Sequence, residues 1–408
     1  MLSPRWTPWG VVLACALGVA FSLGTLAVFS FSLFMKPLAA EFHWSRGEIS
    51  LAGTLVNVAV SAMSPVIGRL ADRYGSAAVV MVGHVLLSAG LCTLALLNGP
   101  LWQLYAVFLL IGILGSGATP PPYSRVVAKW FTAQRGLALG LVMAGGGLGT
   151  FLMPQLVHAV MEWHGWRGAY LALGLCAVAI PLPLAALLIR EPPVSRLSRF
   201  EQTGMTRGEA LRSGVFYHLT GIFFLAALCT NAAVAHLAPI LTDRGMGAGP
   251  AAMAVSLFGL STLCGRLVTG WLVDRLFAPH VAAGLFGLLG VGLLLLRQGA
   301  MGELAAVFSG FGFGAEADIM PYLASRYFGF RAFGEIYGIL FASFTLGIAV
   351  GPPLMGFGFD RTGGYGAPLS AVLGLMAAAV IGVALLPRFP ETPERSELTT
   401  SGMESRLK

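Results

Sequence analysis

The feature that most constrains this chain is a series of twelve apolar runs, each long enough to cross a lipid bilayer. A spanning helix needs about 20 mainly apolar residues. The first six runs lie near residues 9–38, 48–68, 77–97, 101–128, 136–160 and 167–189, and the second six near 214–238, 250–272, 279–297, 301–325, 333–356 and 364–387. Charged residues make up 11% of the chain, whereas a soluble domain carries about 25%. The sequence therefore predicts an all-α membrane protein.

The longest polar stretch between these runs divides the chain into two halves. We predict an amino-terminal six-helix bundle (1–189), a central loop (190–213), a carboxy-terminal six-helix bundle (214–387) and a tail (388–408). Lysine and arginine concentrate in the loops on the side of both termini, which predicts that both termini are cytoplasmic. We expect the bilayer to be a bacterial inner membrane, the plasma membrane of the cell. Because the basic residues are spread over many loops, the net charge of +7 does not indicate a nucleic-acid partner.

The two halves repeat one another in sequence. GRLADRYG (68–75) is echoed by GWLVDRLF (270–277), and GSGATPPPYSRVVAKWF (115–131) parallels GFGAEADIMPYLASRYF (312–328). A third pair of segments, 135–154 and 333–352, shares glycines and a final proline at matching positions. Two repeats in the same orientation predict two bundles related by pseudo-symmetry.

The motif GRLADRYG resembles the signature between spans 2 and 3 of the major facilitator superfamily. The resemblance implies twelve transmembrane helices in two pseudo-symmetric bundles that transport a solute. It also implies a conformational latch: the glycine lets two helices cross closely, the aspartate lies near a helix N-terminus, and the arginine pairs across the cytoplasmic face. The latch residues in the two repeats are Gly68, Asp72, Arg73, Gly270, Asp274 and Arg275.

A second segment, WFTAQRGLALGLVMAGGGLG (130–149), resembles the span 4–5 signature of the monocarboxylate porter family, whose bacterial branch includes lactate and oxalate carriers. GPPLMGFGFDRTGGY (351–365) is similar to the same family. The family has an arginine on span 8, and Arg266 matches it. The animal porters carry an acid one turn earlier, where this chain has Thr262, and a lysine in span 1 that this chain lacks. A single cation favours a monoanion as the substrate.

Three charged residues are expected at one depth inside the carboxy-terminal half. Arg266 lies eight positions before Asp274, and Asp318 eight positions before Arg326, on helices that run the same way. Glu316 lies two residues from Asp318, so the two carboxyls point about 200° apart around a helix. One of them should meet Arg266, and the sequence does not say which. The cluster is either a structural ion pair or a site where Arg266 binds an anion and Glu316 or Asp318 takes up a proton.

Four further residues are candidates for contact with the substrate. A phenol can donate to a carboxylate, and the resemblance places a tyrosine near Tyr123; Tyr322 occupies the place of Arg125 in the other half. For Tyr123, packing at the end of its helix is an equal alternative. Asn57 and Asn231 could line a cavity or bond neighbouring helices. The three prolines in ATPPPYS (118–124) predict a broken helix.

Together these features predict a secondary active transporter of small organic anions. We expect proton-coupled transport of a monocarboxylate such as lactate or pyruvate, by alternating access to a site between the halves. The alternatives are exchange of one carboxylate for another and export of a different small molecule. No metal-ligand or nucleophile cluster is visible, so we expect neither an enzyme nor a cofactor. The expected partners are the carboxylate, protons and the bilayer, with the protein acting as a monomer.

Overall fold

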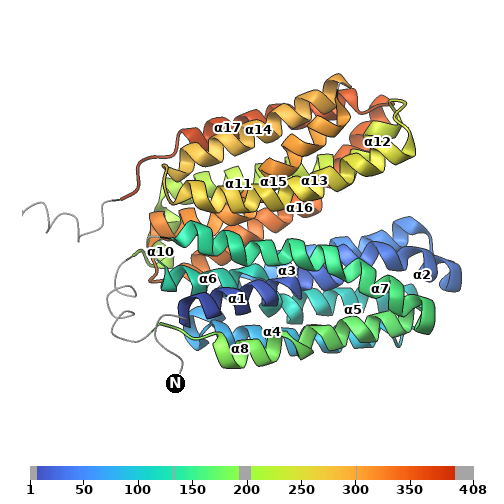
Figure 1. Cartoon of the computed structure of the whole chain (residues 1–408), viewed down its shortest axis with the longest axis horizontal. Helices are drawn as coiled ribbons and strands as arrows, with labels where there is room; N and C mark the ends of the chain where they lie inside the picture. Colours follow the sequence, from blue (N-terminus) through green and yellow to red (C-terminus); the bar gives the residue numbers. More distant parts are fainter. Residues whose placement is uncertain (1–6, 132–133, 193–203, 300, 391–408) are drawn as a thin grey trace, which may run out of the picture.

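The computed structural model describes residues 7–131, 134–192, 204–299 and 301–390, which are almost entirely helical (Figure 1). Parts of the predicted central loop and tail, 193–203 and 391–408, lie outside the described residues. The amino-terminal bundle contains α1 (Thr7–Ala20), η1 (Gly24–Phe29), η2 (Ser30–Phe34), α2 (Met35–Phe42), α3 (Arg46–Tyr74), α4 (Ser76–Leu94), α5 (Leu101–Leu114), η3 (Gly115–Ala118), α6 (Pro120–Trp130), α7 (Arg135–Ala179) and α8 (Pro181–Leu188). The carboxy-terminal bundle contains α11 (Gly214–Ala235), α12 (Leu237–Thr242), α13 (Ala248–Val273), α14 (Ala278–Gln298), α15 (Gly302–Phe328), α16 (Phe333–Thr362) and α17 (Gly366–Ala384), and the short α10 (Arg207–Arg212) precedes it.

Ten helical stretches in the described residues are long and apolar enough to cross a bilayer. The stretch that contains α7 makes two passes, because the chain turns back at Gly165, whose backbone is not helical (φ 65°, ψ −175°). The helix α15 is 27 residues long and runs through the bundle, but Glu316 and Asp318 lower its hydropathy. With these two corrections the described helices make the twelve passes that the sequence predicts.

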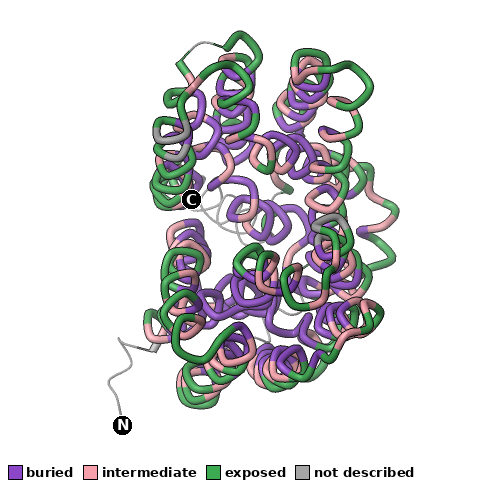
Figure 2. Tube along the Cα trace, turned by 90° about the vertical axis from the view of Figure 1, so that its right-hand side faces the viewer, coloured by how far each residue is buried: buried purple, intermediate pink, exposed green. Residues whose placement is uncertain are grey.

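The outer surface of the helices is apolar, as expected for contact with lipid. Figure 2 shows buried positions along the inner faces of the helices and exposed positions on their outer faces. Large apolar side chains such as Phe151, Leu175 and Phe357 are exposed on that surface. Such a surface would be unstable in water and is stable in a bilayer.

Local sequence signals explain where several helices begin and end. Ser45 and Glu48 form a reciprocal capping box at the start of α3, which satisfies two backbone N–H groups. Gly75 separates α3 from α4 with a φ of 83°, a conformation that favours glycine. The predicted break at 118–124 is confirmed, because Thr119 is extended between η3 and the prolines that begin α6.

The two bundles touch at the end of the molecule where α1 begins and α17 ends, which we call the latch end. The bundles diverge toward the opposite end, which carries α2 and α12 (Figure 1). At the latch end α3 crosses α16 at a pair of glycines, and a Cβ added to Gly68 would lie 1.9 Å from the Gly334 carbonyl oxygen. The repeat-related helices α13 and α7 cross in the same way, with a Cβ on Gly270 lying 2.6 Å from the Gly136 oxygen. Glycine at these positions permits the close approach of the bundles.

A methyl group at Gly68 should therefore force the bundles apart at the latch end. We expect Gly68→Ala to lengthen the distance between spin labels attached at the exposed residues Arg73 and Arg331, in a background without native cysteines. Gly284→Ala is the matched control, because a Cβ at this helical glycine meets no atom within 4 Å. An unchanged distance in Gly68→Ala would show that the crossing does not depend on glycine.

Candidate functional site

The site begins with the close parallel packing of α13 and α15. A Cβ on Gly310 would lie 2.3 Å from the Phe258 oxygen, and a Cβ on Gly314 would lie 2.3 Å from the Thr262 oxygen. Phe258 and Thr262 are four residues apart on α13, and Gly310 and Gly314 are four apart on α15, which is about one helical turn on each helix. One turn further along the same two helices, the facing residues are Asp318 and Arg266.

Arg266 and Asp318 form an ion pair at that position. The Arg266 Nη1 donates to Asp318 Oδ1 over 2.9 Å. The Asp318 side chain is 2% exposed and the Arg266 side chain 14% exposed, so the pair is nearly withdrawn from solvent. The Arg266 Nε and the second Asp318 oxygen are buried without a hydrogen-bond partner. The guanidinium thus retains a donor that its counter-ion does not use.

Glu316 points to a different helix. Its carboxyl group is fully buried and hydrogen-bonds to the Thr230 hydroxyl on α11. Of the two acids that the sequence left open, Asp318 is therefore the one that meets Arg266. Because the two carboxyls point roughly 200° apart, Glu316 contacts α11 on one side of α15 and Asp318 contacts α13 on the other.

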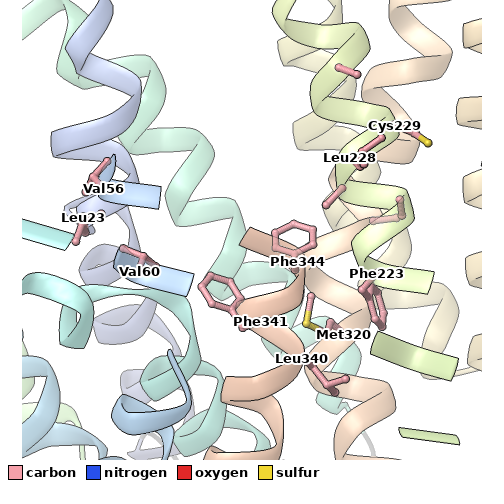
Figure 3. Packing of buried hydrophobic residues seen from close by; sticks show 14 of the residues in the cluster. Leu23, Val56, Val60, Phe223, Leu228, Cys229, Met320, Leu340, Phe341 and Phe344 are labelled. Atoms are coloured by element: carbon pink, nitrogen blue, oxygen red, sulfur yellow. The ribbon is translucent and has the colours of Figure 1, made fainter. Parts of the chain in front are cut away.

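The ion pair lies where the two bundles meet. A Cβ on Gly140 of α7 would come within 2.9 Å of the Arg266 carbonyl oxygen, so α13 contacts the amino-terminal bundle at this residue. A second contact between the bundles joins α3 to α16. The Ser61 hydroxyl of α3 donates to the Ala342 carbonyl oxygen of α16 over 2.7 Å. Next to Ala342, the aromatic ring of Phe341 lies between the labelled α3 residue Val60 and the α11 residue Phe223 (Figure 3).

At the latch end, each bundle offers an aspartate to a helix N-terminus of the other bundle. Asp72 accepts from the backbone N–H groups of Gly334 (3.1 Å) and Glu335 (2.9 Å) at the start of α16. In the repeat, Asp274 accepts from Gly136 (2.7 Å) and Leu137 (2.9 Å) at the start of α7. An anion at a helix N-terminus is stabilised by the unsatisfied N–H groups and the helix dipole.

The cation that pairs across the latch is not the predicted one. Arg69, not Arg73, reaches Glu335 on the other bundle, with an Nη2 to Oε1 distance of 2.6 Å. Arg207 of α10 binds the same carboxylate over 3.1 Å. Arg73 lies over the ring of its neighbour Tyr74 instead. Arg69 precedes Arg73 by four residues, about one helical turn, so the two lie on the same side of α3. The motif therefore predicts the helix that carries the cation but not its position.

Two other arginines lie at the latch end: Arg275, which the sequence predicts to be part of the latch, and Arg135, which it does not. Arg275, in the turn after α13, stacks on Trp271 of that helix, 4.1 Å from the ring centroid, so its predicted part in the latch is not a contact between bundles. Arg135 of α7 was not singled out from the sequence. Its Nη1 donates to the Ser325 hydroxyl of α15 over 3.0 Å and so joins the bundles.

The two latches differ in what supports the aspartate. Arg125 donates to Asp72 over 2.7 Å and to Glu191 over 2.5 Å, and Lys129 lies 3.6 Å from Glu191. In the repeat, Tyr322 takes the place of Arg125 and Arg326 that of Lys129. Arg326 lies over the ring of Phe389, 4.8 Å from its centroid. An ionic network thus supports the latch at Asp72. At the latch of Asp274, Tyr322 and Phe389 occupy the places of Arg125 and Glu191.

The remaining candidate residues do not gather around Arg266. Tyr123 is fully buried, its hydroxyl lies 2.6 Å from His84 Nε2 on α4, and Gly18 leaves room for its ring. Tyr322 lies near Asp274 and Arg135 at the latch end. The amides of Asn57 and Asn231 donate to carbonyls of their own helices, Gly53 (2.8 Å) and Ala227 (2.9 Å). This conformation therefore does not support direct substrate contact for the two tyrosines.

Several residues of the site were not found from the sequence. His84 is a single polar residue in an apolar run, and nothing in its local pattern distinguishes it; Thr230 directly precedes the candidate Asn231 but was not itself identified. Glu191 carried no such signal either, because the segments REPP (190–193) and RFPE (388–391) share an arginine and a proline but the second has Phe389 at the position of Glu191. In the part of the chain that the structure describes, no three His, Cys, Asp or Glu residues are grouped as metal ligands would be.

Comparison with known proteins gives a consistent result. The model of the Major Facilitator Superfamily matches residues 15–339. The chain is 30% identical to mouse monocarboxylate transporter 11 over 387 residues, which cover 88% of this chain and 83% of the relative. It is 29% identical to bovine monocarboxylate transporter 13 over 424 residues, covering 98% and 95%. The fold is similar to that of FucP, a superfamily transporter crystallised in an outward conformation, with a TM-score of 0.70 at 16% identity, covering 93% of this chain and 98% of that one.

The ionic network around Glu191 generates a pH prediction. Burial acts to raise the pKa of Glu191, but the positive charges of Arg125 and Lys129 hold it below its usual value of 4.5. A lowered pKa means that the ion pairs stabilise the fold above that value and are lost as the pH falls below it. We expect the apparent unfolding temperature to fall on acidification to about pH 4 or below.

The variant Glu191→Gln should already be less stable at neutral pH, by about 1–3 kcal/mol, and should lose less on acidification. Glu162→Gln is the control, because Glu162 is exposed and contacts His158 of the same helix. Equal acid sensitivity of Glu191→Gln and the unmodified protein would contradict the role of this network.

Proposed function

Because the chain belongs to the Major Facilitator Superfamily and is a relative of the monocarboxylate transporters, we propose that it carries small monocarboxylates across the membrane together with protons. The observation that carries the proposal is the ion pair between Arg266 and Asp318, buried where the bundles meet. An arginine at such a depth is costly unless it has a partner or a function. A guanidinium is also well suited to a carboxylate, because its donors match the two oxygens.

Coupling follows from competition for one cation. We propose that a substrate carboxylate first meets the unused donor of Arg266 and then displaces Asp318, which becomes a buried anion without a counter-ion. A buried, unpaired carboxylate takes up a proton instead of remaining charged. Substrate and proton therefore bind together, and the loaded site carries no net charge. A neutral site costs less to enclose in a low-dielectric environment than a charged one.

The latch provides the conformational part of the mechanism. The contacts of Asp72 and Asp274 hold the bundles together at the latch end. We assign this end to the cytoplasm from the distribution of lysine and arginine. The described conformation is then closed toward the cytoplasm, and transport proceeds when these contacts break and the bundles rock about the site. Both termini then lie in the cytoplasm, and we propose a bacterial inner membrane as the location.

Substitutions of the ion pair test the proposal in proteoliposomes with an inward proton gradient. Arg266→Ala should reduce uptake of labelled lactate or pyruvate by about 30-fold or more, since the anion loses its counter-charge and Asp318 is left unpaired. Asp318→Asn should keep exchange of carboxylates between the two sides but lose accumulation driven by the proton gradient. The control is Arg167→Ala, which breaks an exposed ion pair with Glu41 at the opposite end of the molecule.

Normal uptake by Arg266→Ala would contradict the assignment of the anion site. Accumulation by Asp318→Asn that a protonophore still abolishes would contradict the assignment of the proton. If the unmodified protein moves labelled carboxylate only into vesicles preloaded with another carboxylate, the protein is an exchanger.

A further inference from the structure

The carboxyl group of Glu316 has no role in the mechanism above. It is 0% exposed, it lies two residues from Asp318, and it contacts α11 through Thr230. Its second oxygen is buried without a hydrogen-bond partner. A carboxyl group in such a place is either a destabilising buried anion or a neutral acid, and its hydrogen bonds distinguish the two.

The hydroxyl of Thr230 has one hydrogen and two neighbours. Its Oγ1 lies 2.9 Å from the Ala226 carbonyl oxygen, one turn earlier on α11, and it also contacts Glu316 Oε1. The carbonyl oxygen has no hydrogen and can only accept. If Thr230 donates to Ala226, the hydrogen between Thr230 and Glu316 must come from Glu316. A protonated Glu316 thus satisfies both contacts, whereas an ionised one leaves two acceptors competing for one hydrogen.

The charges near Glu316 do not pair with it. From α13, the titratable or charged group that interacts with it is Arg266, whose positive charge favours the ionised form, but the ion pair of Arg266 is with Asp318. From α11, the group is Cys229, whose sulfur hydrogen-bonds to the Val372 carbonyl oxygen on α17 and so faces away. On α15 itself, Asp318 carries the same negative charge. Among the described residues no cation contacts Glu316, and an unpaired buried carboxylate is strongly disfavoured.

We propose that Glu316 is a neutral acid that donates a hydrogen bond to Thr230 and thereby holds Asp318 toward Arg266. The geometry of α15 links the two events. Because the carboxyls point about 200° apart, a bond from Glu316 to α11 fixes the rotation of α15 that places Asp318 against α13. Glu316 is then a positioning residue, and the transported proton is the one that Asp318 takes up. The positioning role rests on the proposed function, whereas the protonation state does not.

Infrared spectroscopy of the purified protein in lipid tests the protonation state without any transport. With glutamate isotopically labelled, a protonated-carboxyl band should be present at neutral pH and absent in Glu316→Gln. Thr230→Val should shift this band, because it removes the hydrogen-bond acceptor with little change in shape. Thr230→Ser, which retains the hydroxyl, should leave it in place. Absence of the band from the unmodified protein at neutral pH would overturn the proposal.

Transport measurements test the positioning role separately. Glu316→Gln should keep the rate and the pH profile of uptake, since its amide can donate to Thr230 as the acid does. Glu316→Leu should raise the KM by about tenfold and change the pH profile, since α15 loses this tie to α11. Loss of proton-driven accumulation in Glu316→Gln would assign the proton to Glu316 and overturn the proposal. If no carboxylate is transported by the unmodified protein, the proposed function and the positioning role both fail, while the infrared band still decides the protonation state.

Discussion

Burial of an arginine in a low-dielectric interior is the constraint on which the rest of this structure depends. Arg266 is 14% exposed and its counter-ion Asp318 is 2% exposed, so neither charge is stable alone. The glycines Gly310 and Gly314 bring α13 and α15 close enough for the pair to form. The same constraint gives the site its chemistry, because any anion that replaces Asp318 at Arg266 requires the displaced carboxylate to become neutral.

At the latch end, backbone N–H groups of the opposite bundle stabilise two partly buried carboxylates. Asp72 and Asp274 satisfy N–H groups at the starts of α16 and α7, each from the opposite bundle. These contacts are hydrogen bonds between side-chain carboxylates and backbone N–H groups, and each joins one bundle to the other. The supports are unequal: Arg125 joins Asp72 to Glu191, whereas Tyr322 lies beside Asp274. The pseudo-symmetry of the sequence is therefore retained in the backbone of the latch and lost in its side-chain charges.

Much of this architecture could be predicted from the sequence, because hydropathy and repeats are local signals. The twelve passes follow from hydropathy, the break before Pro120 from its three prolines, and the shared level of Arg266 and Asp318 from their spacing along two helices. The sequence does not predict how each helix is rotated about its own axis, and therefore which of its side chains faces which neighbouring helix. Whether Glu316 or Asp318 faces Arg266, and whether Arg69 or Arg73 crosses the latch, depends on how neighbouring helices pack. The burial of Tyr123 against His84 was missed for the same reason, since the two residues lie on different helices.

The central claim is that one cation shared by a substrate carboxylate and Asp318 couples the anion to a proton. Its most direct test is to measure proton and labelled lactate or pyruvate uptake together, in proteoliposomes that contain the unmodified protein. We expect protons and carboxylate to enter in equal amounts, without net movement of charge. Carboxylate entry without protons, or entry accompanied by net charge movement, would contradict it.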